Sequence, residues 1–213
     1  MDKRISDLLG KRAFLRTRDM VEAGIDRRVI ARAVRSGDLV NPAISAAHPE
    51  HGIFCARGTD NDPDHNEALV MFLFGGKAVF GMQYAAMRQG LATGIPETMQ
   101  VFVPYEVVLG PRDYLKVTRT RRREALEVGV VEVPTALGVP VRITSPARTV
   151  VDLLRNKDRN VEDWRHGIDA LKTYFETGGD TGELMEVASA FDRRLPDIVE
   201  TAIQTYAPGG PTP

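Results

Sequence analysis

The sequence predicts an α+β protein with a small N-terminal helical domain, a mixed α/β middle and a helical C-terminal end. Apolar residues recur at helical spacing near both ends of the chain, and β-branched residues cluster in the middle. The 213 residues are 43% hydrophobic and 27% charged. This composition is ordinary for a globular protein that buries a sizeable core.

Two short helices are expected before residue 24. One covers residues 3–10, and the other covers residues 18–23 with Thr17 as its N-cap. Gly24 ends the second helix, because glycine takes left-handed dihedrals without steric cost. The apolar residues expected to point inward are Ile5, Leu8, Leu9, Met20 and Val21.

A third helix is expected over residues 26–36, in the stretch "AGIDRRVIARAVRSGDLV". Asp26 is the predicted N-cap and Gly37 the predicted stop. At about 100° per residue, four arginines surround Ala31 on one side of this helix. They are Arg27, Arg28, Arg32 and Arg35, and the opposite side carries Val29, Ile30, Ala33 and Val34.

An arginine front with a small central residue suits the major groove of DNA, which admits a helix and presents guanine to arginine. A solvated surface helix is the alternative interpretation of the same pattern. Residues 1–40 contain ten basic and six acidic residues in a chain of net charge −1. This asymmetry favours a nucleic-acid-binding head on a body of different purpose.

Two strand-like runs follow, "DLVNPAIS" and "GIFCARG", on either side of "AAHPEH". They are expected to form a hairpin beside the helices. Two helices joined by a tight glycine turn and followed by a hairpin predict a winged helix-turn-helix. Arg57, at the end of the second run, would then serve the wing.

The body is expected to begin near residue 60. "KAVF" and "MQVFVP" read as strands, "GMQYAAMRQGL" as a helix, and "GVVEVPTALGVPVRIT" as two strands joined by a turn. Ser145 and Pro146 predict the start of a helix, because serine caps and proline fits the first helical position. From residue 161 the pattern is helical, and the tail 207–213 is expected to be disordered.

The single cysteine, Cys55, excludes an internal disulfide and favours a reducing, cytoplasmic environment. Its place in a strand-like run predicts a buried apolar side chain. We expect no membrane span and no signal peptide, because the apolar runs are short and the N-terminus is charged. His48 and His51 have no further ligand at a zinc spacing, so a solvated loop is expected there.

Three segments occur in an order that resembles the AbiEi family, the antitoxins of type IV toxin–antitoxin systems. They are "RTRDMVEAGIDRRVIARAVRSGDLV", "HGIFCARG" and "VPVRITSPARTVVDLL". The resemblance covers nearly the whole chain. Its most specific parts are the glycine-turn helix and "TSPARTVVDLL", and neither is a catalytic signature.

The resemblance implies a winged helix over residues 1–59 joined to an antitoxin domain over residues 60–206. It implies a repressor that binds inverted repeats in its own promoter, and a partner toxin that is a nucleotidyltransferase. Whether a homodimer forms on the DNA stays open. Residues 26–36 correspond to the DNA-reading helix, and no chemistry is carried over for Arg148 and Asp152.

The chain departs from the family at the wing, which is often a short run that ends in glycine and an aromatic residue. Here "NPAISAAHPEH" is longer, and Ile53 stands between Gly52 and Phe54. Whether this wing contacts DNA therefore stays open.

The acidic stretch "DNDPDHNE" (residues 60–67) does not fit a calcium loop. Such a loop needs glycine at its sixth position and glutamate at its twelfth, where this chain has His65 and Met71. Asp64 and Glu67 are expected to form a capping box for the next helix instead. We expect neither a metal nor a cofactor.

A nuclease is the enzymatic alternative, because winged heads are also joined to endonuclease domains. Metal-dependent cleavage needs converging carboxylates, usually with a lysine. Glu132 has no lysine at the expected spacing, and Asp113 with Lys116 has no second strand acid nearby. A phosphate-cradling GxxxxGK loop is missing too, so we expect no enzyme.

A second basic run, "KVTRTRRRE" (residues 116–124), is expected to be a solvated face. The alternatives are a second phosphate-contacting patch and a surface for an acidic or RNA-bound partner.

The first hypothesis is therefore a DNA-binding repressor with an antitoxin body, and the second a pure protein-interaction module with a basic head. Phosphates would be clamped at the start of the second helix, where backbone N–H groups favour anions. The predicted DNA-binding residues are Arg16, Thr17, Arg18, Arg27, Arg28, Arg32, Arg35 and Arg57.

Overall fold

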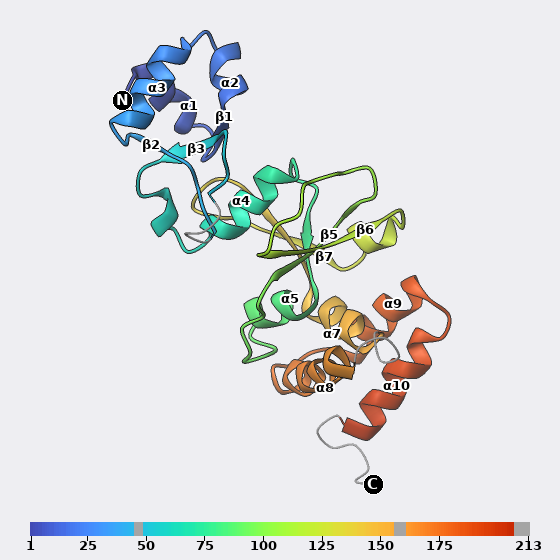
Figure 1. The fold of residues 1–213 in the computed structure, drawn as a ribbon. Helices are drawn as coiled ribbons and strands as arrows, with labels where there is room; N and C mark the ends of the chain where they lie inside the picture. The colour runs from blue at the N-terminus through green and yellow to red at the C-terminus, as the bar shows by residue number, and fades with distance from the viewer. Residues whose placement is uncertain (45–48, 156–160, 207–213) are drawn as a thin grey trace. The chain divides into compact units, whose positions relative to one another are not determined.

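The computed structural model describes residues 1–44, 49–155 and 161–206, and it confirms the α+β class. The chain forms two compact units (Figure 1). The first comprises Met1–Gly76 and Val133–Val141, and the second comprises Lys77–Glu132 and Arg142–Pro213. The first unit thus continues past residue 59, where the sequence analysis ended the head. The predicted disordered tail, 207–213, lies outside the described residues.

The first unit combines short helices with a three-stranded antiparallel sheet of order β1-β3-β2. Its elements are α1 (Lys3–Leu9), β1 (Leu15–Arg16), α2 (Thr17–Glu22), α3 (Arg27–Arg35), β2 (Leu39–Val40), β3 (Ile53–Ala56), the 3-10 helix η1 (Thr59–Asn61) and α4 (His65–Leu73). The predicted hairpin is confirmed, since Leu39 pairs with Ala56 and Val40 with Cys55. Strand β1 was not predicted. Two residues carry no periodicity, and only pairing with β3 makes them a strand.

One apolar cluster holds the helices of this unit to its sheet. Its buried members are Ile5, Leu15, Met20, Ile25, Ile30, Ala33 and Leu39. Cys55 is buried as predicted, and burial raises the pKa of its thiol to about 11. Val21 was predicted to point inward but is 38% exposed, so α2 buries a narrower stripe than its sequence indicated.

Helix α4 belongs to the first unit because aromatic side chains connect it to the head. The Phe14 ring lies 5.6 Å from that of Phe72 and 5.5 Å from that of His65, measured between centroids. The predicted capping box at the start of α4 is wrong, because the Asp64 side chain makes no cap hydrogen bond. Asp62 lies two residues before Asp64, and its Oδ1 accepts a hydrogen bond from the Asp64 N–H at 2.9 Å.

The second unit is built on a five-stranded mixed sheet of order β6-β5-β4-β8-β7. Its strands are β4 (Val79–Phe80), β5 (Met99–Pro104), β6 (Leu115–Thr120), β7 (Val130–Val133) and β8 (Val141–Thr144), and its helices are α5 (Met82–Arg88), α6 (Glu124–Glu127), α7 (Pro146–Leu154), α8 (Val161–Glu176), α9 (Thr181–Phe191) and α10 (Leu195–Tyr206). Strand β4 pairs antiparallel with β5 and parallel with β8, and β5 pairs parallel with β6. The segment after Tyr114, for which the sequence analysis predicted no helix or strand, forms the edge strand β6 and the short helix α6.

Helix α7 lies at the centre of this unit and packs against α5, α8, α9 and α10 (Figure 1). As predicted, Ser145 caps it and Pro146 occupies its first turn. Every residue from Ala147 to Leu154 is buried. Gly167 on α8 permits the close approach of the two helices, because a Cβ there would lie 3.1 Å from the Leu154 backbone nitrogen.

Across residues 1–44, 49–155 and 161–206, none of the helices combines the length and the apolar character that crossing a bilayer requires.

Candidate nucleic-acid interface

Helix α3 has the boundaries and the N-cap that its sequence predicted. The Asp26 Oδ1 accepts from the Arg28 N–H at 2.7 Å. At the other end Gly37 has a φ of 72°, and the N–H of Asp38 donates to the Ala33 carbonyl at 2.9 Å. This is the Schellman arrangement, which satisfies the last carbonyls of a helix.

The connection between α2 and α3 repeats that arrangement at Gly24, whose φ is 77°. The Gly24 N–H donates to the Val21 carbonyl at 2.9 Å, and the Ile25 N–H donates to the Met20 carbonyl at 3.0 Å. Ile25 is buried, so the turn is anchored in the core. The Arg4 guanidinium adds a hydrogen bond of 3.0 Å to the Gly24 carbonyl, which ties α1 to the turn.

One side of α3 is a continuous exposed surface, which we call the arginine face. It consists of Arg27, Arg28, Ala31, Arg32 and Arg35, all exposed. The opposite side buries Ile30 and Ala33. Across the part of the chain that the structure describes, no ion pair involves the four arginines. Four cations on about three turns of helix therefore present their charge to solvent.

Val34 was predicted on the apolar side but is 37% exposed. At about 100° per residue it lies on the flank of the helix, well around the axis from the buried Ala33. The core of this small unit covers only the stripe through Val29, Ile30 and Ala33. Val34 therefore borders the arginine face.

Arg57 has a structural partner that the sequence did not indicate. Its Nε donates to the Gly37 carbonyl at 2.9 Å, and its Nη2 lies 3.5 Å from the Ser36 carbonyl. The side chain thus caps the C-terminal end of α3 from strand β3. These contacts support the end of α3, and because Arg57 is also exposed, its predicted contact with DNA stays a prediction.

A pair of glycine substitutions tests this role. Gly37→Ala is expected to destabilise the fold by about 1–2 kcal/mol, because alanine is strained in the left-handed backbone conformation of this position. The new Cβ would also clash with Nη2 of Arg57 and displace that side chain. Gly24→Ala is the matched control, because its φ is similar but nothing lies within 4 Å. Urea unfolding followed by circular dichroism should show the larger loss for Gly37→Ala. Equal losses would mean that Arg57 does not brace α3.

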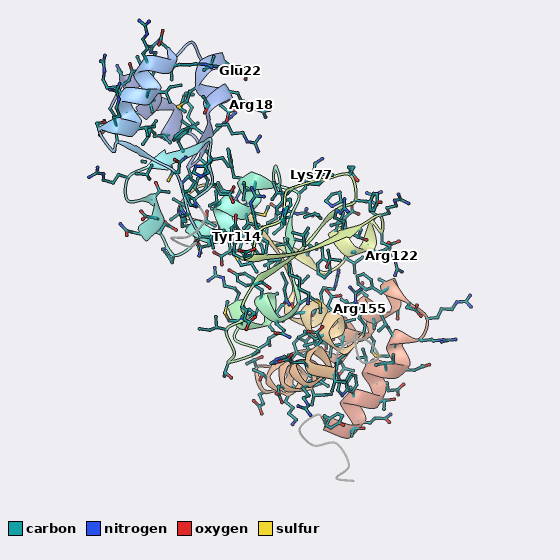
Figure 2. All side chains as sticks on the ribbon, viewed as in Figure 1. Arg18, Glu22, Lys77, Tyr114, Arg122 and Arg155 are labelled. Atoms are coloured by element: carbon teal, nitrogen blue, oxygen red, sulfur yellow. The ribbon has the colours of Figure 1, made fainter. Side chains whose placement is uncertain are left out.

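Two of the three residues predicted to clamp phosphates at the start of α2, Arg16 and Thr17, make contacts within the protein. Arg16, and not Thr17, is the N-cap, and its N–H donates to Asp19 Oδ2 at 2.8 Å. The Arg16 guanidinium lies 5.0 Å from the centre of the Phe72 ring, and the Thr17 N–H donates to the Gly52 carbonyl at 3.2 Å. Arg18 remains exposed, with its Nε 3.7 Å from an Asp19 oxygen (Figure 2).

Asn41 links the two ends of the loop that connects β2 to β3. The Asn41 Nδ2 donates to the Ile53 carbonyl at 2.7 Å and to the Glu50 carbonyl at 3.3 Å. His51 is exposed, whereas His48 lies outside the described residues.

The residues weighed for metal or nuclease chemistry do not converge. Throughout residues 1–44, 49–155 and 161–206, no three His, Cys, Asp or Glu side chains are grouped so that they could hold a metal ion. His65 is buried against Phe14, and burial lowers the pKa of its imidazole. Glu132 and Asp113 are exposed on separate parts of the second unit.

The second basic run, residues 116–124, is exposed at every position except the half-buried Thr120. Arg119 and Arg121 lie over the Tyr105 ring, at 5.3 and 4.1 Å from its centroid. Arg123 forms an ion pair of 2.8 Å with Glu127. The predicted solvated face is therefore confirmed, with Tyr105 and Glu127 as partners at the surface.

A buried ion pair was missed, although its spacing of four residues on a predicted helix could have indicated it. Arg148 Nε lies 2.9 Å from Asp152 Oδ2, and both side chains are 0% exposed. Arg155 Nη2 lies 3.2 Å from the other oxygen of Asp152.

No family model and no curated protein sequence matches this chain. Among solved structures, the chain is similar to the crystal structure of the RV2827C protein from Mycobacterium tuberculosis. The two are 15% identical, the match covers 88% of this chain and 80% of that one, and the TM-score is 0.44.

Proposed function

We propose that this chain is a sequence-specific, double-stranded DNA-binding repressor whose α3 reads the major groove. The observation that carries the proposal is the arginine face: Arg27, Arg28, Arg32 and Arg35 are all exposed around Ala31. None of these four side chains belongs to the apolar cluster of the described part of the first unit, which uses the other side of α3.

The surroundings of α3 support the proposal. Helix α2, the Gly24 turn and α3 are followed by the β2–β3 hairpin, which is the order of a winged helix-turn-helix. Both ends of α3 are fixed, by Asp26 and by Gly37 with Arg57. Its nine residues make a helix about 13 Å long, which is the length of roughly four base pairs.

The proposal is tested by fluorescence anisotropy with the DNA upstream of the chain's own gene. Binding to this DNA is expected to be at least about a thousandfold tighter than to a scrambled duplex of equal composition. Equal affinity for the two duplexes would contradict sequence-specific repression. Magnesium added to the same samples tests the nuclease alternative. The DNA is expected to stay intact, and cleavage would favour a nuclease.

A smaller prediction concerns Arg35, at the C-terminal end of the arginine face. Arg35→Gln is expected to weaken binding to the promoter and to scrambled DNA alike, because the end of a recognition helix lies nearest the phosphates. The slope of log K against log salt should fall by about one. Arg12→Gln, an exposed arginine outside α3, is the control. An unchanged slope for Arg35→Gln would show that no phosphate contact is lost.

The antitoxin role is proposed on the resemblance to the AbiEi family alone. Co-expression with the product of the adjacent gene, where this encodes a nucleotidyltransferase, is expected to restore growth that the toxin alone arrests. Growth arrest in spite of co-expression would contradict the antitoxin role and would leave the repressor proposal intact.

A further inference from the structure

The second unit contains a cavity of about 370 Å³ that the proposed DNA-binding role does not use. It lies between the edge strand β6, the C-terminal end of α7, and the connection from α9 to α10. Its lining residues are Phe102, Thr118, Thr120, Arg122, Ala125, Arg155, Phe191, Asp192, Arg194, Leu195 and Ile198. The volume falls in the lower part of the range of small-molecule sites, roughly 300–1,000 Å³.

Three arginines from separate elements line this cavity. Arg122 follows β6, Arg155 ends α7, and Arg194 precedes α10. Arg122 is held in place, because its Nη2 donates to the Phe191 carbonyl at 2.6 Å. Figure 2 shows Arg122 and Arg155 beside the region where β6 and the C-terminal helices of this unit meet. Several arginines around one cavity are typical of binding sites for multiply charged anions.

The charge behind the cavity wall is also positive. Arg148 and Arg155 share the single carboxylate of Asp152. The two guanidinium carbons lie 4.1 and 5.2 Å from the centre of the Phe191 ring, which lines the cavity. Burial lowers the pKa of Arg148, yet an arginine keeps its proton in a protein. Two guanidinium groups and one carboxylate leave a net positive charge behind the wall, which favours an anion in the cavity.

The one acid of the lining, Asp192, is already engaged with the backbone. Its Oδ1 accepts from the Arg194 N–H at 2.9 Å at the start of α10. The hydroxyl groups of Thr118 and Thr120 add donors on the β6 side. Phe191, Leu195 and Ile198 supply an apolar wall. The lining thus combines an anion-binding end with a surface for an organic group.

We propose that this cavity binds a small organic phosphate. The phosphate group is held by Arg122, Arg155 and Arg194, and the organic part lies against the wall of Phe191, Leu195 and Ile198. A terminal phosphate matches the three cations better than a nucleic-acid backbone does, because each phosphodiester carries one charge and continues on both sides. The proposal is independent of DNA reading by α3.

Isothermal titration calorimetry of the full chain tests this site with AMP, adenosine and inorganic phosphate. AMP is expected to bind with a Kd of about 1 mM or tighter, and adenosine at least about tenfold more weakly. The difference follows from the phosphate contacts. Inorganic phosphate should compete with AMP.

Variants locate the site. Arg122→Gln combined with Arg194→Gln is expected to weaken AMP binding at least about tenfold. The control is Arg193→Gln, an exposed neighbour that does not line the cavity. Circular dichroism should show that the variants are folded. Thr118→Val offers a second variant on β6 that keeps all the charges.

Four outcomes would overturn the proposal. The first is the absence of saturable AMP binding, and the second is equal affinity for AMP and adenosine. The third is displacement of AMP by a short duplex without a terminal phosphate, which would assign the cavity to a nucleic-acid backbone. Equal losses in the Arg193 control would place binding elsewhere.

Discussion

Replacement of Arg28 and Arg32 together by alanine is expected to weaken promoter binding by about 2–6 kcal/mol, which is the sum of two base-contacting arginines. Both side chains are exposed near the middle of the arginine face, one helical turn apart on α3. Each would donate two hydrogen bonds to a guanine edge, and alanine leaves that edge unpaired. The measurement is fluorescence anisotropy at fixed salt with promoter and scrambled duplexes.

The matched control is Lys11→Ala with Arg12→Ala. It removes the same charge from exposed positions of the same compact unit, outside α3. If general charge attraction drives binding, both double variants should lose affinity equally for every duplex. If α3 reads bases, the α3 variant loses affinity mainly for the promoter. Unchanged promoter affinity in the α3 variant would remove the basis of the repressor proposal.

Removal of Arg148 is expected to be the most destabilising change in the second unit. Arg148→Ala leaves the fully buried Asp152 with one guanidinium instead of two, and loss of one partner of a buried ion pair costs about 3–5 kcal/mol. Carbonyl groups of Glu124, Ala125 and Val128 also lose a donor. The free energy of unfolding should be measured in urea by circular dichroism.

Changes at Asp152 separate the pair from its surroundings. Asp152→Asn, which leaves the buried Arg148 without its carboxylate, should also destabilise the fold. The combination Arg148→Met with Asp152→Leu should recover part of the loss, because an apolar pair carries no desolvation penalty. Losses below about 1 kcal/mol in both single variants would show that the pair contributes little.

The sequence predicted those features of the candidate site that depend on neighbours along the chain. The N-cap Asp26 and the glycines at 24 and 37 act within a few residues, so they set the limits of α3 locally. The helical period then places the four arginines on one side. For the same reason the start of α7 at Ser145 and Pro146 was predicted correctly.

Contacts between distant segments were not predictable in this way. Arg16 lies on Phe72 and Arg57 caps α3, and each of these contacts joins residues at least twenty positions apart. The sequence by itself gives no reason to treat one arginine as more available to DNA than another. Only the fold shows which of them contact other segments, as Arg16 and Arg57 do, and which face solvent alone, as Arg28 does.

The sequence alone determined the α+β class, the caps of α3 and α7, and the charge of one helix face, because these follow from residue type and local spacing. Tertiary structure decided that β1 pairs with β3, that Arg148 and Asp152 are buried together, and that Arg122, Arg155 and Arg194 surround one cavity. The physical reason is distance along the chain. Burial and convergence arise from packing between segments, and no local pattern records which segments will meet.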